Sequence, residues 1–339
     1  MSDFESAGDV LKGLKLPVPA RRRKGLKPDG PAAMRLIETA THIAQGDELK
    51  RIYSHTAFCQ IGLPYRKLDP AERVWTRKNG NVLMEISAGR AYDDKRDAFV
   101  DVEMPWGPKV RLVQIYLDSM AVQTQNRMIE TDKSLTSFVT EKLKLDGGGR
   151  TIKSVKAALG QFAAATWRFG VSNNGKALTI NTQIVESFEI WMPKDERQRV
   201  LFPEFVEYSQ KYFENLMEHA VPMLDEAVAG LSHNAMALDI YRWLAQRLHR
   251  QNPDRPMMLT WNVLHEQFGW NYGRLDHFRP VFLRTLAEVL AVYPQARGKV
   301  FADGPNEVCH DGRGLWLCHA EPPVLKIQTT VPKLPSGKR

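Results

Sequence analysis

Apolar and polar positions repeat with two different periods along the chain, and each change of period marks the edge of a predicted element. Between residues 58 and 104, short apolar runs such as Val82-Leu83-Met84 lie on both sides of Asn79-Gly80, a dipeptide typical of two-residue hairpin turns. After Pro105 the apolar residues recur with the period of a helix. The pattern therefore predicts a small antiparallel meander followed by a helix.

Two more helices are predicted after the first one. A short helix begins with Ser134 as its N-cap and is broken by the glycines 147–149. The next helix runs from Arg150 to about Phe169, and its apolar side chains fall within an arc of about 80° at a spacing of about 100° per residue. This arc, the predicted buried face, contains Ile152, Val155, Leu159 and Phe162.

The opposite face of this third helix is polar and basic, and it contains Arg150, Lys153, Ser154, Ala157 and Gln161. Cations, an amide and a hydroxyl at the start of a helix, directly after a glycine turn, suit a recognition helix in the major groove of DNA. The free N–H groups of its first turn can also bind a phosphate. Charged faces are also common on helices that only face water, so that interpretation stays open.

The stretch from Gly170 to Ala177 comes within one residue of a nucleotide-binding P-loop. Ala177 stands where a P-loop has the hydroxyl residue that binds magnesium. A P-loop also leads from a strand into a helix, whereas here a predicted helix comes first and the alternating, strand-like residues 178–184 follow. We therefore predict a β-hairpin whose tip carries Asn173 and Lys176, placed to contact phosphate, and the ATPase interpretation is disfavoured.

The order helix, short helix, basic helix and hairpin occurs a second time. Ile115-Tyr116 and Ile240-Tyr241 lie 125 positions apart, and each of three apolar residues of the third helix has a counterpart 123 positions later, from Leu275 to Phe282. A last hairpin is predicted to turn at residues 311–314. Nearly constant offsets indicate two similar domains. The fold class expected is α+β, with two tandem winged-helix (helix-turn-helix) domains.

The second basic helix is predicted to be a weaker reader of DNA than the first. Its outward face contains Asp276, His277, Pro280, Arg284 and Ala287, with Arg274 ahead of it and Arg279 on its flank. A proline is tolerated only near the start of a helix. The helix is therefore expected either to begin late or to bend at Pro280.

Composition indicates a globular, non-secreted chain. Of its 339 residues 43% are hydrophobic, which is enough for buried cores, and no apolar run reaches the roughly 18 residues of a membrane span. The N-terminus lacks the pattern of a signal peptide, and three cysteines cannot all pair. We therefore expect a cytoplasmic protein with reduced thiols and no membrane contact.

The net charge of +8 is unevenly distributed. Residues 1–33 contain seven Lys/Arg and four Asp/Glu, residues 322–339 contain four Lys/Arg and no acid, and residues 142–176 contain seven Lys/Arg against the single acid Asp146. The two proline-rich ends are expected to be disordered basic tails, which either bind nucleic acid or only add solubility. The basic segment 142–176 supports a nucleic-acid partner.

Candidate residues for catalysis or metal binding are few. Cys309-His310 and Cys318-His319 imitate a zinc site, but their spacing fits no familiar ligand pattern and both pairs lie on predicted wing strands. Tyr116 and Tyr241 fall on apolar helix faces, as core residues do. We therefore expect no enzyme, no metal and no cofactor.

Several runs of the sequence resemble the RepA-type plasmid replication initiators. They are residues 62–66, 74–77, 104–113, 123–125, 188–194, 237–241 and 244–250. The resemblance covers roughly residues 34–295, and it departs from the family pattern at Pro280 and after Pro294. It implies a non-enzymatic protein that binds repeated double-stranded DNA sites at a plasmid origin, promotes origin opening and recruits the host initiator and replicative helicase. It also implies monomers active in replication and dimers that repress.

These expectations divide the chain into a basic arm (1–33), a first winged-helix domain with an N-terminal β-meander (34–195), a second winged-helix domain (196–321) and a basic tail (322–339). The alternative function is a winged-helix transcriptional repressor with no role in replication. The more distant alternative is an enzyme, either an ATPase or a nicking initiator. The predicted DNA-binding residues are Arg150, Lys153, Ser154, Lys156, Gln161, Asn173, Lys176, Arg274, His277, Arg279 and Arg284.

Overall fold

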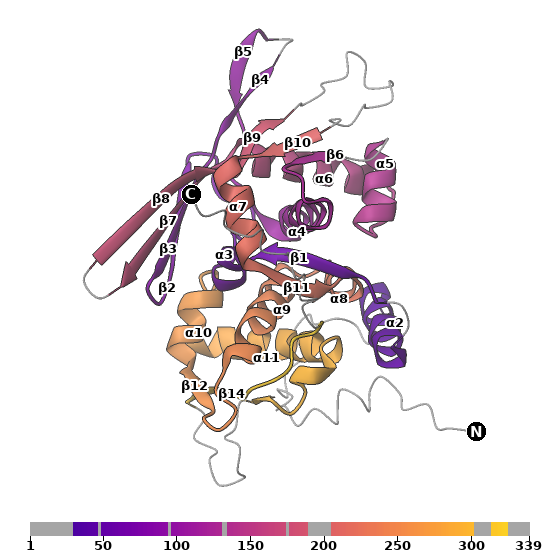
Figure 1. The fold of residues 1–339 in the computed structure, drawn as a ribbon, viewed down its shortest axis with the longest axis vertical. Coiled ribbons are helices and arrows are strands. Elements are labelled where there is room, and N and C mark those ends of the chain that lie inside the picture. Colours follow the sequence, from indigo (N-terminus) through magenta and orange to yellow (C-terminus); the bar gives the residue numbers. More distant parts are fainter. Residues whose placement is uncertain are drawn as a thin grey trace, which may run out of the picture.

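The computed structural model describes residues 30–46, 49–93, 96–130, 134–173, 176–188, 205–301 and 313–324. Within these ranges the protein combines helices with small sheets in which every paired strand is antiparallel (Figure 1). The expected α+β class is therefore confirmed. In the described part of the chain no helix is long and apolar enough to cross a membrane.

The central region has the predicted order of elements. Ser134 caps the short helix by accepting a hydrogen bond from the Ser137 N–H at 3.1 Å, and Leu135, Phe138 and Val139 are buried as expected. A π-helical turn continues this helix. The elements are α4 (Gly107–Thr124), β6 (Met128–Glu130), α5 (Leu135–Ser137), η1 (Phe138–Lys142), α6 (Gly149–Ala164), β7 (Thr166–Asn173) and β8 (Lys176–Gln183).

Helix α6 ends five residues before the predicted position, so the expectation of a helix to Phe169 is wrong. Ala165 already has an extended backbone, and Trp167 belongs to strand β7. Its indole is fully buried and lies edge-on to the ring of Phe58, with 5.3 Å between ring centroids. Residues 166–171 contain β-branched and aromatic side chains that a sheet accommodates well. Pairing with β3 thus overrides the apparent helical period.

The first two predicted hairpins are present, and they join in one sheet of order β2-β3-β7-β8. Strands β2 (Val74–Asn79) and β3 (Val82–Ser87) leave a two-residue turn in which Gly80 has φ +59°, a value that favours glycine. Asn173 pairs with Lys176 at the end of the second hairpin, and residues 174–175 between them lie outside the described residues. Gly170 and Lys176 both belong to strands, which is incompatible with a P-loop.

The second half repeats the same order of elements. They are α9 (Ala235–Arg247), η2 (Leu248–Arg250), β12 (Met257–Thr260), α10 (Trp261–Phe268), α11 (Leu275–Ala291), η3 (Pro294–Ala296), β13 (Val300–Phe301) and β14 (Gly314–Leu317). The three strands form a sheet of order β12-β14-β13, and the predicted turn at 311–314 is described only from Arg313 onward. Helix α11 begins at Leu275 and contains Pro280, so the expected late start is wrong.

The predicted tails extend too far inward at both ends. Residues 31–33 belong to α2 (Pro31–Gln45), a helix with a proline at its start. At the other end Pro323 is buried and Val324 packs against the core. Residues 1–29 and 325–339 lie outside the described residues, so the expectation of disorder there stays a prediction.

Several contacts cross residue 195, where the sequence predicts a domain boundary. Strand β1 (Arg51–His55) pairs with β11 (Ala220–Leu224) in the middle of the molecule, and β10 (Phe205–Tyr208) pairs with both β6 and β9 (Val185–Phe188) (Figure 1). Helix α2 packs against α8 (Asp225–Gly230) and α11, and α3 (Thr56–Gln60) packs against α9. The remaining elements are β4 (Arg90–Asp93), β5 (Ala98–Asp101) and α7 (Gln210–His219). The described residues thus share one continuous core, while the domain limits stay a prediction.

A buried ion pair joins helices α4 and α9 inside this core. Arg111 is fully buried and donates Nε and Nη2 to the two carboxylate oxygens of Asp239, at 2.8 and 2.7 Å. Its remaining N–H groups reach the carbonyl oxygens of Leu63, Pro64 and Gly107 at 2.6 to 3.2 Å. All five donors of the guanidinium are therefore satisfied, which offsets the cost of burying its charge.

A second buried arginine completes the contact between the two helices. Arg242 donates to Asp239 and, at 2.8 Å, to the side-chain oxygen of Gln114 on α4. A Cβ atom on Gly62 would overlap the Asp239 carboxylate, so only glycine fits at that position. We call Arg111, Gln114, Asp239 and Arg242 the buried joint.

Asp118 forms a polar centre one helical turn beyond Gln114. Its carboxylate accepts hydrogen bonds from the hydroxyls of Tyr208 and Tyr212, both at 2.9 Å, from the His55 N–H at 2.8 Å and from the Gln114 amide. Burial raises the pKa of Asp118 to about 6, against the opposing effect of these donors. Segments far apart in the sequence therefore meet at one carboxylate.

Candidate nucleic-acid interface

The turn that leads into α6 is organised by Asp146. Its carboxylate accepts hydrogen bonds from the Thr151 hydroxyl at 2.9 Å and from the Gly148 N–H at 3.1 Å. These bonds, that of Thr151 first, lower the pKa of Asp146 below its ordinary value. The only acid of the basic segment 142–176 thus fixes the start of the basic helix.

Most of the predicted outer face of α6 is accessible. Arg150, Lys153 and Ser154 are exposed, and the Ser154 hydroxyl donates to the Arg150 carbonyl oxygen at 3.0 Å. Lys156 is half-buried and takes part in interactions with its neighbours. Within the described residues Arg150 and Lys153 form no ion pair, so their charges face solvent.

Gln161 does not belong to this exposed face, and its predicted position is wrong. Its side chain is only 6% exposed, and its amide donates to the Glu103 carboxylate at 3.4 Å. The last turns of α6 are covered on more sides than an arc of four apolar residues suggests. Gln161 therefore cannot reach a ligand in this arrangement.

The two predicted wing residues lie at the expected place in the backbone. Asn173 ends β7 and Lys176 begins β8, and the two are paired across the hairpin end. Their side chains lie outside the described part of the structure. Their contacts with DNA stay a prediction.

The predicted basic residues of the second helix, α11, make more contacts with other side chains than those of α6 do. Arg274 forms a two-pronged ion pair with Asp276, with nitrogen-to-oxygen distances of 3.0 and 2.8 Å. Arg279 is half-buried and lies over the indole ring of Trp261, 4.7 Å from its centroid. His277 and Arg284 are exposed. The second face therefore presents less free positive charge than the first.

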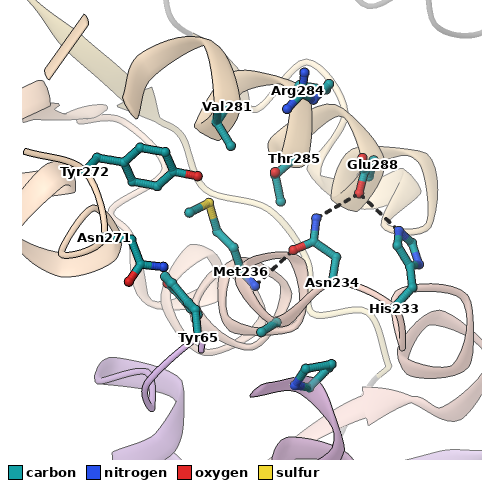
Figure 2. Close-up of a pocket in the computed structure, with 12 residues that line it drawn as sticks. Tyr65, His233, Asn234, Met236, Asn271, Tyr272, Val281, Arg284, Thr285 and Glu288 are labelled. Atoms are coloured by element: carbon teal, nitrogen blue, oxygen red, sulfur yellow. Dashed lines mark hydrogen bonds and ion pairs between the residues drawn. The ribbon is translucent and has the colours of Figure 1, made fainter. Parts of the chain in front are cut away.

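Arg284 also borders a pocket of about 370 Å³ between the start of α9 and α11 (Figure 2). Glu288 lies on the same wall and contacts the Asn234 amide at 3.2 Å and the His233 ring at 3.6 Å. Asn234 in turn caps α9 by accepting a hydrogen bond from the Met236 N–H at 3.1 Å. With an acid in its wall and the helix start already capped, this pocket is a poor phosphate site.

The structure describes some of the cysteine, histidine and tyrosine residues that the sequence analysis considered as metal ligands or core residues. His319 lies near the Gln251 carbonyl oxygen, at 3.2 Å, and the Glu321 carboxylate, at 3.7 Å, while Cys309 and His310 lie outside the described residues. Tyr241 is fully buried and Tyr116 is half-buried against Phe138.

Sequence reasoning missed the buried joint. Arg111 and Arg242 lie within the predicted core helices, and an arginine in an otherwise apolar stretch is a signal that it has a buried partner. Nothing in the sequence pairs Arg111 with Asp239, because 128 residues separate them.

A comparison with family models agrees with the resemblance found in the sequence. Residues 104–263 match a family model described as "Plasmid encoded RepA protein". The sequence matches none of the curated proteins with which it was compared. One similar solved structure is the crystal structure of RctB domains 2-3, with 10% sequence identity over 67% of this chain and 80% of that chain and a TM-score of 0.43. Another is the crystal structure of selenomethionine derivatives of domain 2 and domain 3 of RctB, with 9% identity over 80% of this chain and 97% of that chain and a TM-score of 0.48.

The family match supports a role in the initiation of plasmid replication. The matched region contains α4, α6, the β7–β8 hairpin and α9, and therefore both the first basic helix and the buried joint. Over residues 104–263 this chain is therefore similar to the RepA-type plasmid replication initiators, the family that its sequence resembles.

Proposed function

We propose that this protein initiates plasmid replication by binding repeated double-stranded DNA sites at the origin through two tandem winged-helix domains. The observation that carries the proposal is the exposed start of α6, where Arg150 and Lys153 face solvent directly after a glycine turn and one hairpin follows. Such a helix places its first turn in the major groove, and the hairpin contacts the backbone beside it.

The second copy of the element order supplies the second reader. In it α10 and α11 take the places of the short and the basic helix, and the β12-β14-β13 sheet takes the place of the wing. Two linked readers gain affinity from effective concentration, which suits directly repeated sites. The first reader contributes most of the electrostatic attraction, because Arg150 and Lys153 are exposed and form no ion pair within the described residues.

The bound protein promotes opening of the duplex and recruits the host initiator and the replicative helicase. It acts in the cytoplasm without enzymatic activity, and homodimers form its repressing state. The family match supports this assignment over a winged-helix repressor, whose readers would have the same geometry.

Footprinting on the encoding plasmid tests the proposal. We expect protection of directly repeated sites of about two helical turns each, followed by permanganate reactivity in adjacent A·T-rich DNA. Protection without duplex opening would indicate a repressor. ATP hydrolysis or a covalent protein–DNA adduct would instead indicate an enzyme.

A further inference from the structure

A cleft of about 470 Å³ lies between the β2–β3 turn and helices α9 and α10. The turn of the hairpin and α10 are neighbours in Figure 1, although they are far apart in the sequence. The lining contains no carboxylate: it consists of amide side chains, a few apolar residues and the two arginines Arg247 and Arg250. This composition differs from that of the pocket beside Arg284, which has Glu288 in its wall.

The two arginines of the cleft form no ion pair within the described residues. Arg250 is exposed at the end of η2. Arg247 is half-buried and lies 5.9 Å from the ring centroid of Trp243, and among the described residues it donates only to the Met257 sulfur, at 2.9 Å. Burial lowers the pKa of Arg247, and no acid opposes that effect. The cleft therefore carries uncompensated positive charge.

Two buried donors at the cleft also lack acceptors. The Nε atom of Arg247 and the indole Nε1 of Trp243 have no hydrogen-bond partner in the described part of the chain. The amides around them are held in place: Asn79 and Gln267 both donate to the Gln60 carbonyl oxygen, at 2.7 and 3.1 Å. A pre-organised, cationic, donor-rich cleft suits an anion.

We propose that this cleft binds a phosphate group. Guanidinium and amide donors are the groups that hold phosphate oxygens in protein–DNA complexes, and the Arg247–Arg250 pair supplies charge that no carboxylate in the described part of the chain neutralises. The inference rests on the proposed function, which makes the DNA backbone the expected source of the phosphate. A free nucleotide or polyphosphate presents the same chemistry and is the other source.

The test compares two double variants of the full chain. Arg247→Met/Arg250→Met removes both cleft charges and keeps an unbranched apolar stem at each position, including the one beside Trp243. The matched control, Arg96→Met/Arg255→Met, removes the same charge from two exposed arginines that do not line the cleft. Circular dichroism and thermal unfolding confirm that both variants are folded.

The first measurement is the salt dependence of binding to a duplex of about three helical turns. In the cleft variant the slope of log K against log salt concentration should be smaller by about two than in the control variant. Equal slopes in the two variants, with the unmodified protein still binding DNA, would exclude the DNA backbone as the ligand.

The second measurement is the shift of the unfolding midpoint by pyrophosphate and by ATP. If the control variant keeps this shift and the cleft variant loses it, the cleft binds free phosphate compounds. This conclusion would hold even if the unmodified protein did not bind DNA and the proposed function were wrong. If the cleft variant matched the control in both measurements, the proposal would be wrong. Cleft-dependent binding of poly-glutamate alone would also overturn it, in favour of an acidic peptide.

Discussion

The two basic helices differ in what their cations touch. On α6, Arg150 and Lys153 are exposed and form no ion pair within the described residues. On α11, Arg274 is held by Asp276 and Arg279 lies on Trp261. Counting charges in the sequence therefore overestimates the second reader, because a cation that already has a partner must lose it before it meets a phosphate.

The largest effect is expected at the buried joint, which connects the two halves that contain the two basic helices. Asp239→Asn leaves Arg111 and Arg242 buried without a carboxylate, and we expect a loss of about 3–5 kcal/mol in the free energy of unfolding. Denaturant unfolding measures it. The control, Asp276→Asn, removes the exposed carboxylate of the Asp276–Arg274 pair and should leave the unfolding midpoint unchanged. A loss below about 1 kcal/mol for Asp239→Asn would show that the joint does not hold the halves together.

The next largest effect separates the two readers directly. Arg150→Ala or Lys153→Ala should weaken binding to the cognate repeat by about 1–3 kcal/mol and relax the preference at one base pair, with stability changed by no more than about 0.5 kcal/mol. Arg274→Ala should have a smaller effect, because its guanidinium is already paired. Binding to single-base-substituted repeats at one salt concentration measures both. Equal losses at Arg150 and Arg274 would remove the distinction between the readers.

A comparison of the two readers at different pH values has to account for two buried groups, Asp118 and His55, whose titration changes the stability of the protein. Burial raises the pKa of Asp118 to about 6, which makes stability fall as the pH rises between about 4 and 6. Burial lowers the pKa of His55 to about 4, which makes stability rise over nearly the same window. The two slopes oppose each other in the unmodified protein.

His55→Gln removes one of these slopes. The free energy of unfolding of this variant should fall as the pH rises from about 4 to 6, because only the Asp118 contribution remains. Urea unfolding at several pH values, with the unmodified protein as reference, measures it. A rise over this window would contradict the raised pKa of Asp118.

The smallest effect is expected at the wing. Lys176→Ala should weaken binding similarly on all DNA sequences and reduce the salt slope by about one, because a phosphate contact carries no sequence information. Salt titrations on cognate and unrelated duplexes measure it. ATP hydrolysis that disappears in this variant would overturn the hairpin interpretation of the stretch around it.

Local signals predicted much of this arrangement. Asn79-Gly80 and the turn after Asn173 specify hairpins because their residues tolerate positive φ, and Ser134 caps its helix with its own hydroxyl. The end of α6 was not predictable in the same way, since Trp167 pairs with Ile86 of β3, a strand that lies about 80 positions earlier in the sequence.

The candidate site residues divide in the same way, into features that local sequence signals predict and features that depend on contacts between distant segments. Exposure of Arg150 and Lys153 follows from the helical period alone, whereas Gln161 is buried and hydrogen-bonds to Glu103, a residue of a loop that the helical period does not reveal. The pairing of Arg274 with Asp276 is local, but the free charge of Arg247 and Arg250 is visible only when the β2–β3 turn is placed against α9.

The long sequence separation within the buried joint has a consequence for synthesis on the ribosome. Arg111 leaves the ribosome 128 residues before Asp239, which at about 5–20 residues per second is a delay of roughly 6–26 s. During this interval the backbone carbonyl groups that accept hydrogen bonds from Arg111 have been synthesised, but the Asp239 carboxylate has not. The nascent first half therefore stays open to water around Arg111 until α9 arrives, and a ribosome that stalls between the two helices leaves it exposed to proteases.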